Sequence, residues 1–202
     1  MTSESAGPGR PSLKPQRREQ ILEAAVAVVL EHGISGVTRA RIAEQAGIAP
    51  PLVHHFIGTQ EEVLAATVET IVAHIEQDFI AAAPGDIDPT DALVRSVDVA
   101  FGSEIDAPEV NQLVDELVAY SYRSDRVVEQ LRALYDGLAD ELSDLVAKAH
   151  PASTPEACSQ TAAQIVALAH SAGTFRHLGL TDLATAAHGH ARGLAAAGPG
   201  ER

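Results

Sequence analysis

Residues 38–57 read TRARIAEQAGIAPPLVHHFI. The stretch has the pattern of two short helices joined by a tight turn at Gly47, because glycine tolerates the left-handed backbone that such a turn requires. Thr38 is expected to cap the first helix, and Pro50 suits the first turn of the second. The spacing therefore predicts a helix-turn-helix, although a helical hairpin without a recognition role fits the same residues.

The second helix of this pair is expected to be anchored by Val53, which leaves its other side chains facing outward. A short helix held in this way can lay its N-terminal end in the major groove of DNA. Candidate contacts to phosphates or bases are Arg17, Arg39, Arg41, Pro51, Leu52, His54 and His55. Solvated surface positions remain the alternative for the arginines. One histidine can instead pack inward, because adjacent helical residues point about 100° apart.

Helical spacing of apolar residues continues on both sides of the pair. It predicts about nine helices, over residues 16–32, 38–47, 50–57, 59–83, 90–104, 108–122, 124–149, 154–176 and 181–196. Thr59 and Glu62 have capping-box spacing, and Thr154 followed by Pro155 forms a second helix start. We expect an all-α fold with a Gly-, Pro- and Ser-rich disordered tail over residues 1–14.

Composition supports helices over sheets. Aromatic residues make up only 3% of the chain, so Ala, Val and Leu must supply most of the core. The formal net charge of −14 argues at first sight against nucleic acid, but residues 1–60 carry a net charge of +1 and the remainder −15. The acidic part should weaken non-specific DNA binding without preventing specific binding. On charge alone, an acidic domain with a neutral end remains open.

The run from Arg18 to about Leu64 resembles the N-terminal domain of the TetR family of transcriptional regulators. The matching residues are Arg18, Ile21, Leu22, Ala24, Ala25, Gly33, Thr38, Ile42, Ala43, Ala46, Gly47, Ile48, the stretch VHHFI, Gln60, Glu61 and Glu62. The resemblance implies a three-helix DNA-binding domain at 15–58, followed at 59–198 by a helical ligand-binding and dimerisation domain. Thr38, Pro50 and Gln60 then complete the predicted DNA-binding set.

The sequence departs from the family pattern at several positions. His54 stands where the family usually has a phosphate-binding Tyr, and Gln60 replaces a Lys that commonly contacts phosphate. Ile57 replaces the usual Phe, and Ala49 replaces the frequent Ser cap. A neutral Gln donates a hydrogen bond but releases no counterion. We therefore expect weaker salt-dependent DNA affinity than in a typical family member.

The resemblance also implies a ligand cavity in the middle helices and a homodimer formed by the helices near 154–176 and 181–196. Polar and aromatic residues that can line such a cavity are His74, Phe101, Asn111, Asp115, Tyr120 and Tyr135. The expected partners are operator DNA, a second copy of the chain and a small-molecule effector that releases a repressor from DNA. An internal core role remains the alternative for the two C-terminal helices.

Other classes of protein find little support. Gly-rich phosphate loops, a nucleophile elbow and an HExxH motif are all missing, so we expect no enzyme and no cofactor. His188 and His190 lie two apart and would point to different sides of a helix, so no metal is expected. Cys158 is expected to be a small buried residue.

Without an apolar signal core or an apolar run long enough to cross a bilayer, we expect a cytoplasmic chain that does not associate with membranes. A helical ligand- or protein-interaction module that has lost DNA binding is the alternative function.

Overall fold

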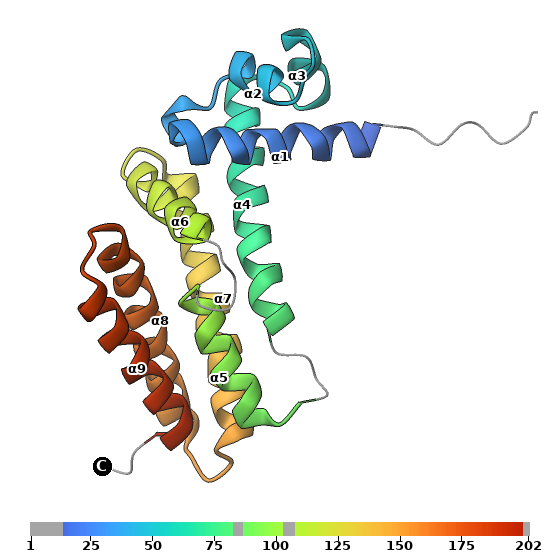
Figure 1. Cartoon of the computed structure of the whole chain (residues 1–202). Helices are drawn as coiled ribbons and strands as arrows, with labels where there is room; N and C mark the ends of the chain where they lie inside the picture. Colours follow the sequence, from blue (N-terminus) through green and yellow to red (C-terminus); the bar gives the residue numbers. More distant parts are fainter. Residues whose placement is uncertain (1–13, 83–86, 103–107, 200–202) are drawn as a thin grey trace, which may run out of the picture.

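The structure, a computed structural model, describes residues 14–82, 87–102 and 108–199 (Figure 1). Within these ranges the chain forms nine α-helices and one short 3₁₀ helix, and no β-strand. They are α1 (Lys14–His32), η1 (Ile34–Gly36), α2 (Arg39–Gln45), α3 (Pro50–Phe56), α4 (Gln60–Ala82), α5 (Pro89–Ala100), α6 (Pro108–Ser121), α7 (Asp125–Ala149), α8 (Pro155–His177) and α9 (Thr181–Ala197). The all-α prediction is confirmed. The predicted tail lies outside the described residues except for Lys14, which opens α1.

Helix starts follow their capping residues. The hydroxyls of Thr38, Ser124 and Thr154 each accept a hydrogen bond from the backbone N–H three residues later. One predicted helix end is wrong: the helix expected to reach residue 104 ends at Ala100. Gly102, with a φ of +65°, adopts the left-handed conformation that commonly follows a helix end. The turn η1 was also not predicted.

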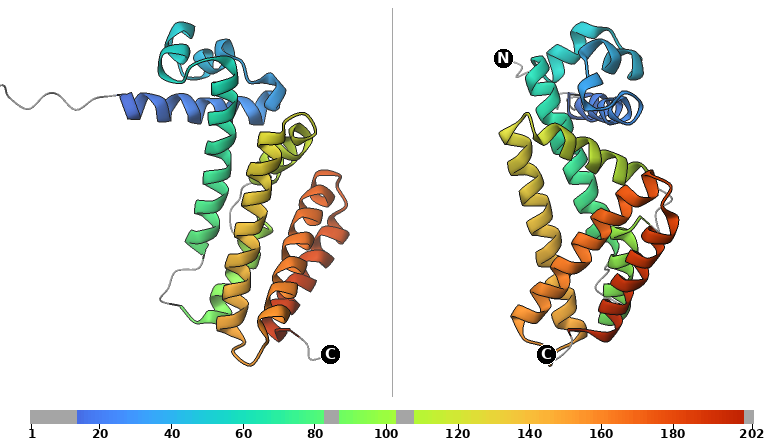
Figure 2. Two further views of the ribbon diagram at one scale, coloured as in Figure 1. Left: turned by 180° about the vertical axis from the view of Figure 1, so that it is seen from behind. Right: turned by 90° about the vertical axis from the view of Figure 1, so that its left-hand side faces the viewer.

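Helices α4 to α9 form a slender body, and helices α1, α2 and α3 lie across one end of it (Figures 1 and 2). Helix α1 runs across the start of α4, with α2 and α3 beyond it, and α4 descends from this unit into the body. Helices α8 and α9 lie side by side along the opposite edge, and α5 and α7 fill the centre. Helix α6 lies where the two parts meet, in contact with α1, η1, α7 and α8.

Two apolar clusters hold this arrangement together. The first joins α1, α2 and α3 to α4, α6 and α7, with Ile21, Ile42, Val53 and Leu117 at its centre. The second joins α5, α7, α8 and α9 and also takes in Phe79 of α4. Because α4, α6 and α7 contribute to the first cluster, the helix-turn-helix is packed onto the body and is not tethered by a loop.

The start of α4 carries the predicted capping box. The Thr59 N–H donates to Glu62 Oε2 at 2.7 Å, and the Glu62 N–H donates to Thr59 Oγ1 at 3.2 Å. These hydrogen bonds lower the pKa of the Glu62 carboxyl from its ordinary value of 4.5. The box fixes the direction in which α4 leaves the helix-turn-helix.

Replacing Glu62 with glutamine is expected to destabilise the protein at neutral pH. A carboxyl whose pKa is lowered by folding stabilises the fold above its unfolded pKa, and this contribution is lost as the pH falls through the folded pKa. The difference between wild type and Glu62→Gln in urea-unfolding midpoint should therefore be present at pH 7 and shrink below about pH 4. Glu61→Gln, its exposed neighbour, is the control; an equal effect of both substitutions at pH 7 would contradict the role of the box.

Candidate nucleic-acid interface and ligand cavity

The turn between α2 and α3 is built as the sequence predicts. Gly47 has a φ of +63°, and the Ile48 N–H donates to the Ala43 carbonyl at 2.9 Å. Ile42 and Val53 are fully buried and fasten the two helices to the first cluster. This packing fixes the orientation of α3, so its outer face is held rigidly.

The outer face of α3 is open to solvent. Pro50, Pro51, Leu52, His54 and His55 are all exposed, Leu52 to 40%. Neither histidine packs inward. His54 Nδ1 lies 2.8 Å from the Gly58 carbonyl, and because a carbonyl only accepts, Nδ1 is the donor. The Nε2 atom of His54 is then an acceptor, or a donor when the ring is protonated. The His55 ring stands edge-on to Phe56, with centroids 5.0 Å apart.

The arginines of this unit differ in their surroundings. Arg39 has an exposed side chain. Arg41 is exposed too, but its Nη1 donates to the Gly36 carbonyl at 2.9 Å, which links α2 to η1. Arg17 on α1 donates to Gln20 Oε1 at 2.7 Å, and Gln20 in turn donates to the Ala46 carbonyl at 3.3 Å. Arg17 is therefore positioned next to a residue that contacts the turn.

Gln60 is engaged within the protein. Its amide nitrogen donates to the Val37 carbonyl at 2.6 Å, and its amide oxygen accepts from the Arg39 N–H at 3.3 Å. The side chain thus joins the start of α4 to the start of α2. No sequence pattern pointed to this link, because it depends on how α4 packs. One amide hydrogen remains for an outside acceptor.

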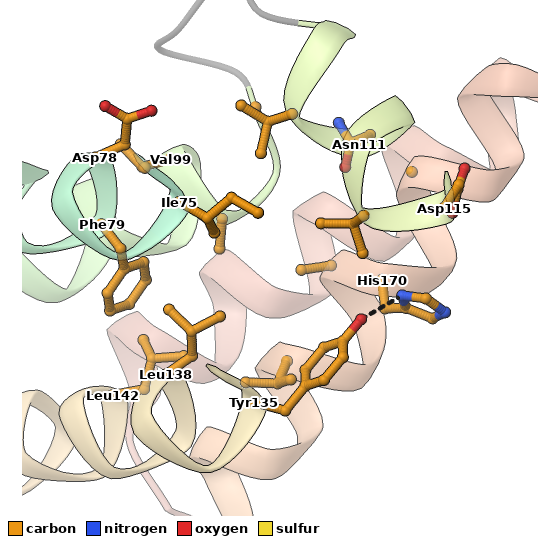
Figure 3. A pocket seen from close by; sticks show the side chains of 17 residues that line it. Ile75, Asp78, Phe79, Val99, Asn111, Asp115, Tyr135, Leu138, Leu142 and His170 are labelled. Atoms are coloured by element: carbon orange, nitrogen blue, oxygen red, sulfur yellow. Dashed lines mark hydrogen bonds between the residues drawn. The ribbon is translucent and has the colours of Figure 1, made fainter. Parts of the chain in front are cut away.

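A cavity of about 90 Å³ lies between α4, α6, α7 and α8, beside the end of α5 (Figure 3). This is smaller than the roughly 300–1,000 Å³ typical of pockets for drug-sized ligands. Its polar lining consists of Asp78, Asn111, Asp115, Tyr135 and His170, and the rest is almost wholly apolar. The lining residues are Ile75, Asp78, Phe79, Val99, Ala100, Gly102, Val110, Asn111, Val114, Asp115, Tyr135, Leu138, Leu142, Val166, Ala169, His170 and Gly173.

Three of the six predicted ligand residues, Asn111, Asp115 and Tyr135, come together on this cavity. The other three lie elsewhere. His74 is exposed on α4, and Tyr120 is half-buried against the first cluster. Phe101 is buried in the second cluster. Asp78 and His170, which line the cavity, were not predicted, because only the packing of α4 and α8 against α6 turns them toward it.

Tyr135 and His170 meet at the cavity wall. The Tyr135 hydroxyl and His170 Nδ1 are 2.9 Å apart, and the rings are nearly perpendicular with centroids 5.9 Å apart (Figure 3). Burial raises the pKa of the Tyr135 hydroxyl, and the neighbouring Asp115 carboxylate raises it further. Tyr135 therefore remains protonated at neutral pH and can donate a hydrogen bond.

Helix α6 contacts both the cavity and the helix-turn-helix unit. Asn111, Val114 and Asp115 line the cavity. On the neighbouring face of the same helix, Gln112 Nε2 donates to the Leu30 carbonyl at 2.6 Å, and Glu116 Oε2 accepts from the Ile34 N–H at 2.8 Å. The last turn of α1 and the first residue of η1 are thus held by side chains of α6.

The buried carboxylate of Asp98 holds His188 and Arg192 in a cluster between α5 and α9, and Phe101 packs against it. His188 Nε2 lies 2.7 Å from Asp98 Oδ1 and its ring stacks on Phe101, while Arg192 Nη1 lies 3.4 Å from Asp98 Oδ2. Asp98 is only 7% exposed, so these partners compensate a buried carboxylate. Among residues 14–82, 87–102 and 108–199, no group of three or more His, Cys, Asp or Glu side chains has an arrangement that could hold a metal ion.

The free faces of α8 and α9 carry small residues. Ala163 and Ala167 on α8, and Ala186, Gly189 and Gly193 on α9, are exposed at helical spacing. The exposed leucines Leu178, Leu180 and Leu183 lie at the junction of the two helices. Cys158 is buried in α8, as expected from its surroundings in the sequence. None of the helices in the described part of the chain is long and apolar enough to span a membrane.

Comparison with known proteins supports the same assignment. A family model described as bacterial regulatory proteins of the tetR family matches residues 21–74. The HTH-type transcriptional regulator BetI of Rhizobium meliloti is 32% identical over 97 residues. These residues make up 48% of this chain and 48% of that regulator, so the chain spans about half the length of this relative. BetI of Agrobacterium fabrum is 28% identical over 156 residues, which cover 77% of this chain and 74% of that one.

Solved structures share the fold over nearly the whole chain. A putative transcriptional regulator from Saccharomonospora viridis in complex with choline has a TM-score of 0.78 at 16% identity, covering 93% of this chain and 100% of that one. A putative TetR-family regulator from Rhodococcus sp. has a TM-score of 0.69 at 23% identity, covering 92% and 100%. Residues 21–74 therefore resemble the tetR family of bacterial regulatory proteins, and the helix-turn-helix and the all-helical body agree with that resemblance.

Proposed function

We propose that the protein is a repressor that binds operator DNA as a homodimer and is released by a small-molecule ligand. The observation that carries the proposal is the rigidly held, solvent-open face of α3. Val53 is fully buried while Leu52 and His55 on the same helix are exposed. We divide the chain into a DNA-binding domain at 15–58 and a ligand-binding and dimerisation domain at 59–198.

In this proposal, α3 enters the major groove and the surrounding unit contacts the phosphate backbone. Pro50, Pro51 and Leu52 make apolar base contacts, and His54 and His55 make hydrogen bonds. Arg17, Thr38, Arg39, Arg41 and Gln60 face phosphates. Arg41 and Gln60 also hold the unit together, through Gly36 and Val37. Few of these residues are permanently charged, so affinity should depend weakly on salt.

The dimer is proposed to form through the free faces of α8 and α9. Their exposed alanines and glycines allow helices to approach closely, as in a four-helix interface between two subunits. The leucines at the junction, of which Leu178 is 63% exposed and Leu183 50%, would be covered in the same contact. Two copies of α3 would then read successive half-sites of a palindromic operator.

Ligand release is proposed to pass through α6. A ligand against Asn111 or Asp115 changes the position of α6, and Gln112 and Glu116 transmit the change to the end of α1. The two α3 helices then no longer match the spacing of the operator. Such coupling requires that the ligand bind one arrangement more tightly than the other.

Selection of bound fragments from genomic DNA by the purified protein tests the proposal. We expect enrichment of a palindromic sequence whose half-sites are separated by about one helical turn or a multiple of it. A folded dimer that enriches no sequence at low salt would overturn the proposal. It would instead favour a helical ligand- or protein-interaction module, an alternative that the internal hydrogen bonds of Gln60 and the net charge of −14 support.

A further inference from the structure

Apart from the imidazole of His170, the side chains that can carry a charge next to the cavity beside α6 are acidic or phenolic. Two carboxylates, Asp78 and Asp115, line it, and no lysine or arginine does so within the described ranges. We propose that this cavity takes a small organic cation, with Asp115 as its counter-ion and Tyr135 as its aromatic contact. The inference rests on the ligand-regulated function proposed above and names the chemical class of the ligand.

Asp115 is the carboxylate best placed for this role. It is half-buried on α6 and makes no hydrogen bond or ion pair with any residue in the described segments. It is close enough to Tyr135 for its charge to act on the phenol. A partly desolvated carboxylate without a partner is unfavourable, and a cation supplied by a ligand removes that cost. Asp78 is exposed on α4 and adds to the negative potential from the other side.

Tyr135 is held in place by His170 and faces an apolar wall. The hydrogen bond of 2.9 Å fixes its hydroxyl, and Phe79 from α4 contributes a second ring to the lining (Figure 3). Aromatic rings attract cations, and the attraction is stronger where water is excluded. The apolar remainder of the wall, with Leu138 and Leu142, suits the hydrocarbon part of an organic ion better than a hydrated metal ion.

Other ligand classes fit this lining poorly. An anion would be brought next to two carboxylates without a lysine or arginine to balance it. A neutral ligand would cover Asp115 and leave its charge without a partner. The cavity of about 90 Å³ also favours a ligand of few non-hydrogen atoms.

Three probes of similar shape and different charge test the inference: tert-butylammonium, tert-butanol and pivalate, each titrated into the full-length protein by NMR. We expect the cation to bind at least about tenfold more tightly than the alcohol and pivalate not to bind, as charge pairing in a partly buried site implies. Asp115→Asn should bring the cation within about twofold of the alcohol and leave the alcohol unchanged. Asp144→Asn, an exposed carboxylate of α7 outside the cavity, should change nothing.

Equal affinities for the three probes, or equal effects of Asp115→Asn and Asp144→Asn, would overturn the inference. A gel shift with the same proteins separates this outcome from failure of the proposed function. Wild type that binds DNA but shows no preference for the cation overturns the ligand class alone. Wild type that prefers the cation through Asp115 but selects no DNA overturns the regulator proposal and leaves the ligand class supported.

Discussion

Replacing Gly33 with alanine should lower the free energy of unfolding by about 3 kcal/mol, because almost no residue other than glycine adopts the backbone conformation found there. Gly33 has a φ of +69° and a ψ of 167°. A β-carbon at this position would also lie 2.9 Å from Glu116 Oε2, the atom that accepts the Ile34 N–H. The substitution therefore strains the backbone and displaces the carboxylate that joins α6 to the helix-turn-helix unit.

Urea unfolding of the variant measures the loss of stability. Gly137→Ala is the matched control, because that glycine lies within α7 with nothing within 4 Å of the added carbon. It should leave the protein equally stable or stabilise it by up to about 1 kcal/mol. If Gly33→Ala were as harmless as Gly137→Ala, the tight approach of α6 to the end of α1 would be contradicted.

Replacing Leu52 with glutamate should lower affinity for the selected operator about 100-fold while the protein remains folded. The carboxylate would face the negative potential of the groove, and an apolar base contact would be lost, together worth about 3 kcal/mol. Leu52 is 40% exposed, so the change should cost little stability. Fluorescence anisotropy with labelled operator and urea unfolding measure the two quantities.

The matched control is Ile80→Glu. Ile80 is an apolar residue 62% exposed on α4, at the end far from the helix-turn-helix. The Ile80→Glu substitution introduces the same charge on a helix surface. It should leave DNA affinity within about twofold of wild type, because the distance between residue 80 and DNA bound at α3 exceeds the electrostatic screening length. Equal losses of affinity for both variants would attribute the effect to net charge instead of to α3.

Local chemistry made the helix-turn-helix predictable. Thr38 caps α2, Gly47 adopts a positive φ and Val53 is buried, each as its residue type and spacing indicate. These features depend on neighbours only a few residues away. The same reasoning missed the turn η1 and placed the end of α5 too late, because a single glycine, Gly102, outweighed a favourable apolar pattern.

The lining of the cavity was predicted only in part, because it depends on how four helices pack. Asn111, Asp115 and Tyr135 line it, whereas Phe101 is turned into the second cluster by stacking on His188, 87 residues away in sequence. Gln60 shows the same limit. The family pattern places Gln60 at a phosphate-contacting position, but it does not show that the Gln60 amide makes hydrogen bonds with the backbone of Val37 and Arg39. Contacts between distant segments leave no periodic signal in a single sequence.

Cleavage of operator DNA by an iron chelate attached to position 52 tests most directly whether α3 lies in the groove. The single native thiol, Cys158, is buried, so Leu52→Cys supplies the reactive site, and Ile80→Cys supplies a matched distant one. We expect cleavage centred within each half-site from position 52 and none from position 80. Absence of cleavage from position 52 in a complex that still binds the operator, or equal cleavage from both positions, would contradict the placement of α3 on DNA.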